Sequence, residues 1–110
     1  MKKFLFLMLG LPAQPDASDQ QTLEYNRRWS EYMGSLAGRG ALESGSPLEP
    51  WGKTVNNKTV IDTQLATPDT YGFMVVKAES LEEAITIARE APHMALGGST
   101  VVRPCVELGR

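Results

Sequence analysis

The chain has 110 residues, of which 42% are hydrophobic and 22% charged, and its formal net charge is -2 at pH 7. This length and composition predict one globular domain over residues 1–110 and exclude a disordered chain. The eleven Lys and Arg residues are scattered along the sequence, so no basic patch marks a nucleic-acid-binding surface and we expect no nucleic-acid partner.

The N-terminal segment MKKFLFLMLGLPAQ can be interpreted in two ways. Two lysines followed by an apolar run imitate a secretory signal peptide. The run ends at Leu11, the small-x-small cleavage site is poor, and the length is too short to span a bilayer. We therefore favour a first strand over residues 3–9, apolar on both faces like a central strand, in a cytoplasmic protein without a membrane partner. A secreted protein is the alternative.

The next segment predicts a long helix. Ser18 with Gln21 has the form of a capping box at the helix start, and Gly38 and Gly40 end the helix. Apolar residues recur between these limits at intervals of three and four, and therefore form one stripe: Tyr25, Trp29, Tyr32, Met33 and Leu36. Trp29, Tyr32 and Met33 are expected in the core, and a ligand platform is the less favoured alternative.

The middle of the chain predicts short strands. Residues 41–45 form a second strand, and the Pro- and Gly-rich segment SPLEPWG is expected to be a loop. Residues 53–62 predict a hairpin, with Asn56 and Asn57 taking the positive φ angles of a tight turn.

The clearest strand covers residues 71–78. Its alternation places Tyr71, Phe73 and Val75 on one face and Met74 and Val76 on the other.

A second helix follows this strand. Ser80 and Glu83 make a second capping box, and Pro92 stops the helix. The helical stripe comprises Leu81, Ala84, Ile85, Ala88 and Ala91. Residues 99–108 have strand composition, and Pro104 within them indicates an edge strand or a bulge.

The order of elements is typical of an α+β, ferredoxin-like βαββαβ fold with an inserted hairpin, in which two helices cover one face of an antiparallel sheet. The strands at 3–9 and 71–78 are apolar on both faces, so the face without helices also needs a cover. A second copy of the sheet supplies it. We therefore expect a homodimer through the sheet face, a dimeric α+β barrel, with any small-molecule pocket between sheet and partner.

Nearly the whole chain resembles the YCII-related family, often marked by an Asp-Gly-Pro-Phe motif. The resemblance rests on four segments: MKKFLFLMLG, WSEYMGSLAGRGALESGSPL, YGFMVVKAESLEEAITIAREAPH and GGSTVVRPC. It implies a ferredoxin-like subunit, dimerisation through sheets, and a cleft suspected of catalysis. The chain departs from the motif, because Asp62 is followed by Thr63-Gln64-Leu65. A helix-one His–Asp dyad found in some relatives is absent, since the first helix has Asn26, Arg27, Arg28 and Trp29 there.

His93, the only histidine, has two interpretations. It follows the second helix, where an imidazolium can bond a terminal carbonyl. Alternatively the segment PHMALGG lines a cleft, with two glycines letting the backbone approach a ligand and His93 acting as an acid or base.

Three further residues are candidates for the site. Asp62 either bonds nearby backbone amides or orients His93 as its catalytic partner. Arg103 either holds an anionic ligand or pairs with a carboxylate such as Glu107. Trp51, in a loop where core packing is not expected, covers the cleft or the dimer interface. Cys105, the single cysteine, is expected to be a half-buried strand residue.

The resulting hypothesis is a homodimer that binds a small polar or anionic molecule in a cleft beside the sheet. Its chemistry would be acid–base catalysis without cofactor or metal, using His93 and Asp62 as catalytic residues and Arg103 and Trp51 as ligand contacts. The alternative is a non-catalytic interaction or ligand-sensing module. The sequence leaves open which of the two it is.

Overall fold

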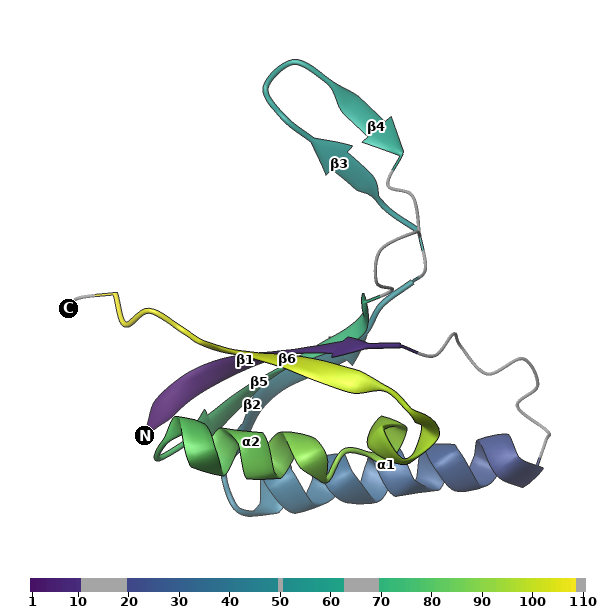
Figure 1. Cartoon of the computed structure of the whole chain (residues 1–110), viewed down its shortest axis with the longest axis vertical. Coiled ribbons are helices and arrows are strands. Elements are labelled where there is room, and N and C mark those ends of the chain that lie inside the picture. The colour runs from purple at the N-terminus through teal and green to yellow at the C-terminus, as the bar shows by residue number, and fades with distance from the viewer. Residues whose placement is uncertain (11–19, 50, 63–69, 109–110) are drawn as a thin grey trace.

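The computed structural model describes residues 1–10, 20–49, 51–62 and 70–108. It shows an α+β fold in which two helices pack on one face of an antiparallel sheet (Figure 1). The elements follow one another as β1 (Lys2–Leu9), α1 (Gln20–Gly38), β2 (Leu42–Pro47), β3 (Lys53–Val55), β4 (Val60–Asp62), β5 (Thr70–Ala78), α2 (Leu81–Arg89), the short 3-10 helix η1 (Pro92–Leu96) and β6 (Ser99–Pro104). The predicted cap at Ser18 and the segment after Asp62 lie outside the described residues.

The main sheet has the strand order β2-β5-β1-β6, with every neighbouring pair antiparallel. This is the ferredoxin-like order, and β3 and β4 form the inserted hairpin as a second, two-stranded sheet. The predicted fold class is thus confirmed. The second strand runs further than predicted, because Ser46 and Pro47 still pair with β5. Pro47 is tolerated there since β2 is an edge strand, which needs no donor on its outer side.

The hydrophobic core lies between the sheet and the helices. The two central strands contribute alternate residues, and the helices contribute the predicted stripes: Phe4, Phe6, Met8, Met74, Val76, Ala78, Tyr32, Leu36, Ala84, Ile87 and Ala88. Two positions of the α2 stripe were assigned wrongly, because Leu81 is exposed and Ile85 is only partly buried, while Ile87, which the predicted stripe did not include, is buried. The predicted cap is present, with the Glu83 amide donating to Ser80 Oγ at 3.1 Å.

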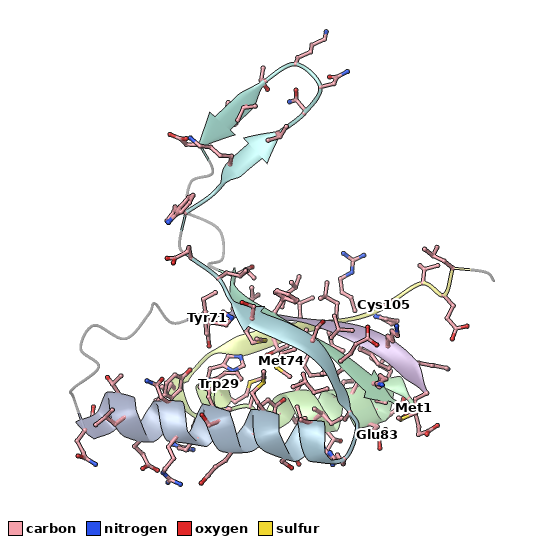
Figure 2. All side chains as sticks on the ribbon, turned by 180° about the vertical axis from the view of Figure 1, so that it is seen from behind. Met1, Trp29, Tyr71, Met74, Glu83 and Cys105 are labelled. Carbon is pink, nitrogen blue, oxygen red and sulfur yellow. The ribbon has the colours of Figure 1, made fainter. Side chains whose placement is uncertain are left out.

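The opposite face of the main sheet, which we call the open face, is also apolar. The cross-strand pairs Leu5–Val75 and Leu7–Phe73 lie on it, next to Val101 of β6. These side chains alternate with the buried ones, and Val101 is 39% exposed. Figure 2 shows side chains standing on this face, away from the helices. The prediction that the central strands are apolar on both faces is confirmed, and no described element of the chain covers the open face.

The hairpin β3–β4 was predicted correctly, but its turn was not. None of the described non-glycine residues has a positive φ, so Asn56 and Asn57 do not form the expected two-residue turn. The connection covers residues 56–59 instead. The Asn56 side-chain oxygen accepts from the amides of Lys58 and Thr59, at 2.8 and 2.9 Å, which closes a wider turn without left-handed backbone.

The end of the chain confirms β6 as an edge strand, in which Pro104 is tolerated. Cys105 is exposed rather than half-buried, because the last strand ends at Pro104 and the cysteine lies just beyond it. No described helix is long and apolar enough to cross a membrane.

A candidate site around His93

His93 lies in η1, between α2 and β6, and its exposed fraction is 0%. The sequence predicted a helix end or a cleft loop here, whereas the structure buries the imidazole between α1 and the sheet. The ring stacks on the indole of Trp29 with centroids 5.6 Å apart and an interplanar angle of 20°. The Tyr71 ring meets it edge-on, with centroids 5.8 Å apart. Aromatic packing explains why a polar ring is found in this interior.

One nitrogen of the ring is fixed by hydrogen bonds. Nε2 lies 2.9 Å from the carbonyl oxygen of Ser99 and 2.9 Å from Thr100 Oγ1. A carbonyl oxygen can only accept, so Nε2 carries the proton in this bond. In the neutral ring Nδ1 is then an acceptor, and it has no hydrogen-bond partner among the described residues although it is buried. The bonded carbonyl belongs to β6, so His93 does not cap the C-terminus of α2.

Two glycines shape the surroundings of the imidazole. Gly97 ends η1 with φ +89°, and its left-handed backbone turns the chain into β6. A Cβ at Gly98 would lie 2.6 Å from His93 Cδ2 and 2.9 Å from the His93 carbonyl oxygen. From the sequence, we expected these glycines to let the backbone approach a ligand. In the structure Gly98 lets the backbone approach the imidazole itself.

Burial lowers the pKa of His93 below its usual value, and the hydrogen bond to the Ser99 carbonyl opposes this shift in part. The cause is that an imidazolium loses more solvation than a neutral ring when it is buried. His93 is therefore neutral at physiological pH, with a proton on Nε2 and a lone pair on Nδ1.

Tyr71 provides a second buried polar atom without a partner. The pairing of β1 with β5 is irregular here: Met8 pairs with Gly72 and Leu9 with Thr70, so Tyr71 falls in the irregularity. Its ring packs against the core and His93 instead of lying with Phe73 and Val75, as strict alternation predicted. Its hydroxyl is buried and has no hydrogen-bond partner among the described residues.

The surroundings of Tyr71 keep its hydroxyl protonated. Burial raises the pKa of the phenol, and a side-chain interaction with the Tyr25 phenol, which does not meet the geometry of a hydrogen bond, raises it further. Tyr25 also meets Trp29 edge-on, with ring centroids 6.4 Å apart. Four of the connected rings, those of Tyr25, Trp29, Tyr71 and His93, form what we call the aromatic site. Trp29 and Tyr71 are labelled in Figure 2.

The aromatic site offers one acceptor and one donor. Nδ1 of His93 can accept a hydrogen bond or a proton, and the Tyr71 hydroxyl can donate one. The site contains no charged side chain, so it suits uncharged polar groups better than ions. Tyr25, Trp29 and Tyr71 are only half-buried, so the aromatic site extends to the protein surface through them.

The other three predicted residues lie elsewhere in the chain. Asp62 is on β4, with its side chain 73% exposed, and forms an ion pair with Lys53 of the same hairpin. Trp51, 72% exposed, lies just before β3. Arg103 of β6 pairs with Leu5 of β1. It lies on the open face, because its neighbour Val102 packs against the core. A single chain therefore does not bring His93 together with Asp62, Arg103 or Trp51.

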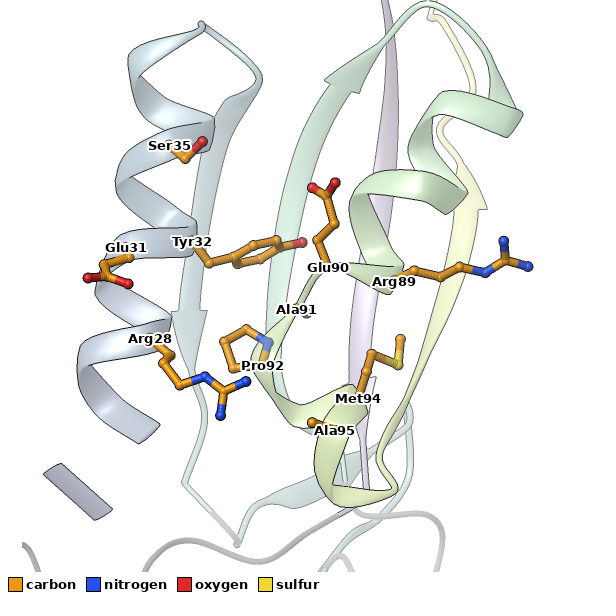
Figure 3. A pocket seen from close by; sticks show the side chains of 10 residues that line it. All are labelled: Arg28, Glu31, Tyr32, Ser35, Arg89, Glu90, Ala91, Pro92, Met94 and Ala95. Atoms are coloured by element: carbon orange, nitrogen blue, oxygen red, sulfur yellow. The ribbon is translucent and has the colours of Figure 1, made fainter. Parts of the chain in front are cut away.

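A groove of about 450 Å³ lies on the helix layer, between α1 and the segment formed by the end of α2 and η1 (Figure 3). Tyr32 points across it from α1, and its hydroxyl donates to the Ile87 carbonyl at 2.8 Å. The walls also carry Arg28 and Glu90, so cations and anions both border the groove. None of the four predicted residues lines it. The described residues contain no group of three or more His, Cys, Asp or Glu side chains that could hold a metal ion.

Comparisons with known proteins support the fold and nothing finer. No family model matches the chain, and no curated protein matches it in sequence. Among solved structures, the chain is similar to 5-chloro-2-hydroxyhydroquinone dehydrochlorinase from Burkholderia phenoliruptrix in complex with 2,5-dihydroxybenzoquinone. The TM-score is 0.57 and the identity 19%, and the match covers 97% of this chain and 95% of the other. At this identity the likeness shows a shared fold over nearly the whole length.

Proposed function

We propose that this protein is a YCII-related homodimer that binds a small hydroxylated molecule at the aromatic site, with His93 and Tyr71 as its polar contacts. A single observation carries the proposal: two buried polar atoms, His93 Nδ1 and the Tyr71 hydroxyl, have no partner among the described residues. An unpaired buried polar atom costs about 1–3 kcal/mol, so two of them in one cluster need a reason. A ligand that bonds both atoms provides it.

The chemistry of the cluster defines the class of ligand. A hydroxyl group can donate to Nδ1 and can also accept from the Tyr71 hydroxyl, so a hydroxylated ligand offers the kind of partner that each atom lacks. The indole of Trp29 and the phenol of Tyr25 favour a flat, apolar body for the rest of the molecule. The structurally similar dehydrochlorinase was solved with 2,5-dihydroxybenzoquinone, a flat hydroxylated ring, and this supports the same class here.

Acid–base chemistry at this site would start with His93 as the base. The Ser99 carbonyl already holds Nε2–H, which is the orienting role first assigned to Asp62. Because burial disfavours the imidazolium, Nδ1 can accept a proton only from an acidic hydroxyl, such as that of a phenol or enol, whose anion then balances the charge. Binding therefore has stronger support than catalysis.

Roles for Asp62, Arg103 and Trp51 depend on a second copy of the chain. Arg103 lies on the open face, which would meet the partner in a sheet-to-sheet dimer, and there it can hold an anionic group. The apolar open face supports this dimer, because in a single chain water would contact Leu5, Leu7, Phe73 and Val75. Asp62 and Trp51 would reach a site on the open face of the partner from the β3–β4 hairpin and the segment just before it.

Calorimetric titration with a panel of small phenols and diols, beginning with resorcinol, tests the proposal. Wild type should bind members of the panel. Tyr71→Phe and His93→Gln should each weaken binding about 3- to 10-fold, the effect of one hydrogen bond. Glu82→Gln, at an exposed position of α2, is the matched control and should bind as wild type does.

The same titration separates the proposal from its alternative, an assembly module without a ligand. An assembly module should bind no member of the panel. In such a module, Tyr71→Phe should change the stability of the protein but not its oligomeric state. Equal loss of binding in Glu82→Gln and Tyr71→Phe would contradict the aromatic site.

A further inference from the structure

The hairpin β3–β4 carries apolar side chains that nothing in the described chain covers. Val55 and Val60 face each other as a cross-strand pair, and both are more than 60% exposed. The ion pair Lys53–Asp62 lies on the same face, because residues two apart in a strand share a face. Ile61, paired with Thr54, lies on the other face and is 58% exposed. Figure 1 shows the hairpin projecting away from the main sheet and both helices.

An isolated hairpin of this size is not expected to be stable in water. Two short strands with no packed face are at best marginal, and three residues in each strand form few ladder bonds. Val55 and Val60 lose the benefit of burial while they remain in water. The hairpin is therefore expected to rest on an apolar surface that a single chain does not provide.

The open face of a second copy has the required properties. Leu5, Leu7, Phe73 and Val75 form adjacent apolar rows on it, and the hairpin of the same chain stands clear of it. The Lys53–Asp62 pair neutralises the two charges next to the valines, so this face of the hairpin can approach apolar side chains. Because each copy carries both surfaces, two copies can exchange hairpins about a two-fold axis.

We propose that β3–β4 is a dimerisation arm whose Val55–Val60 face packs on the open face of a second copy of this chain. This inference rests on the proposed homodimer and specifies its contacts. The arm also carries Trp51 and Asp62 onto the sheet that presents Arg103. Trp51 and Asp62 of one copy would then lie nearer to Arg103 of the other copy than to the Arg103 of their own chain, so a site on the open face would be incomplete without the partner.

Cross-linking between differently tagged copies tests the arm. In a Cys105→Ser background, one copy carries Val60→Cys and the other carries either Leu7→Cys or Val101→Cys on the open face. The two copies are co-expressed and treated with a short bismaleimide. A matched control replaces the open-face cysteine with Ser35→Cys, on the exposed side of α1. Light scattering first establishes that each mixture is dimeric.

If the arm packs as proposed, Val60→Cys of one copy should cross-link to at least one open-face cysteine of the other, differently tagged copy. It should not cross-link to Ser35→Cys. Dimers that cross-link to neither open-face position would overturn the arm and leave the homodimer standing. Monomers in every mixture and in the Cys105→Ser parent would overturn the homodimer itself. As a second variant, Val60→Lys should raise the dissociation constant of the dimer at least about tenfold. An unchanged circular dichroism spectrum would show that the main domain still folds. A dimer as tight as that of wild type would also contradict the arm.

Discussion

Nε2 of His93 lies 2.9 Å from the carbonyl oxygen of Ser99, and this contact determines which nitrogen of the ring is free. The carbonyl needs a donor, so the proton is on Nε2 and the lone pair is on Nδ1. The side chain is fully buried, so that lone pair has no access to bulk water. A buried, neutral histidine whose Nδ1 acceptor has no partner in the part of the chain that the structure describes is therefore the central feature of this protein.

The stability of the protein should fall as the pH drops below about 6.5, the ordinary pKa of histidine. Burial lowers the pKa of folded His93, so the unfolded chain binds a proton that the folded chain does not. The full contribution of the neutral ring to the free energy of unfolding is present above the pKa of histidine in the unfolded chain. As the pH falls from that pKa to the lower pKa of the folded protein, this contribution is lost by up to about 1.4 kcal/mol per pH unit. Urea titrations between pH 8 and 5 measure this slope. His93→Gln, which keeps a donor for Ser99, should remove most of the slope, and an equal slope in the variant would contradict the assignment.

Gly98→Ala should destabilise the protein by about 1–3 kcal/mol. The added Cβ would lie 2.6 Å from a ring atom of His93, and the imidazole cannot retreat because Trp29 stacks on it. Gly34→Ala is the control. That position lies in α1 with no atom within 4 Å of the new Cβ, so alanine should stabilise the helix by about 0.5–1 kcal/mol. Thermal unfolding compares the two, and equal effects would contradict the packing around His93.

Tyr71→Phe and Tyr32→Phe should change stability in opposite directions. The Tyr71 hydroxyl is buried without a described partner, so its removal should raise the free energy of unfolding by about 1 kcal/mol. The Tyr32 hydroxyl donates to the Ile87 carbonyl at 2.8 Å, so its removal should cost about 1 kcal/mol. Denaturant unfolding at neutral pH measures both. Destabilisation of similar size in both variants would mean that the Tyr71 hydroxyl is already bonded within the protein.

Much of the fold could be predicted from the sequence, because its signals are local. The double-sided apolar strands, the Ser80–Glu83 cap and the stripe of α1 follow from residue spacing, and the structure contains each of them. The errors occurred where spacing is not decisive. Nothing local distinguishes the turn of residues 56–59 from a two-residue turn when both asparagines can close either one.

The site could be predicted only in part. His93 stood out as the only histidine in the sequence. Its burial depends on the ring of Trp29, 64 positions earlier, and on the ring of Tyr71, which packs toward the core although the alternation of side chains in β5 predicts the opposite face. Trp29 was assigned to the core, and a helix stripe gives no sign that one member will stack on an imidazole. A pair of glycines after a histidine was the available signal for close packing, and it was interpreted as an approach route for ligand.

A lysine on the open face should disrupt the proposed dimer. Phe73 and Val75 both face away from the helices, so Phe73→Lys or Val75→Lys would bury an unpaired charge in the interface with the partner chain. Leu81→Lys, at an exposed position of α2, should leave the dimer intact. Size-exclusion chromatography with light scattering distinguishes these outcomes, and dimers from both open-face variants would contradict contact through this face.

The most direct measurement is the ¹⁵N spectrum of the imidazole of His93, which gives one pair of signals because the chain has a single histidine. We predict a protonated Nε2 and an unprotonated Nδ1 at neutral pH, and a shift of the Nδ1 signal on titration with resorcinol or another member of the phenol and diol panel. The shift should weaken in Tyr71→Phe. A proton on Nδ1, or an Nδ1 signal that no member of the panel moves, would contradict the aromatic site.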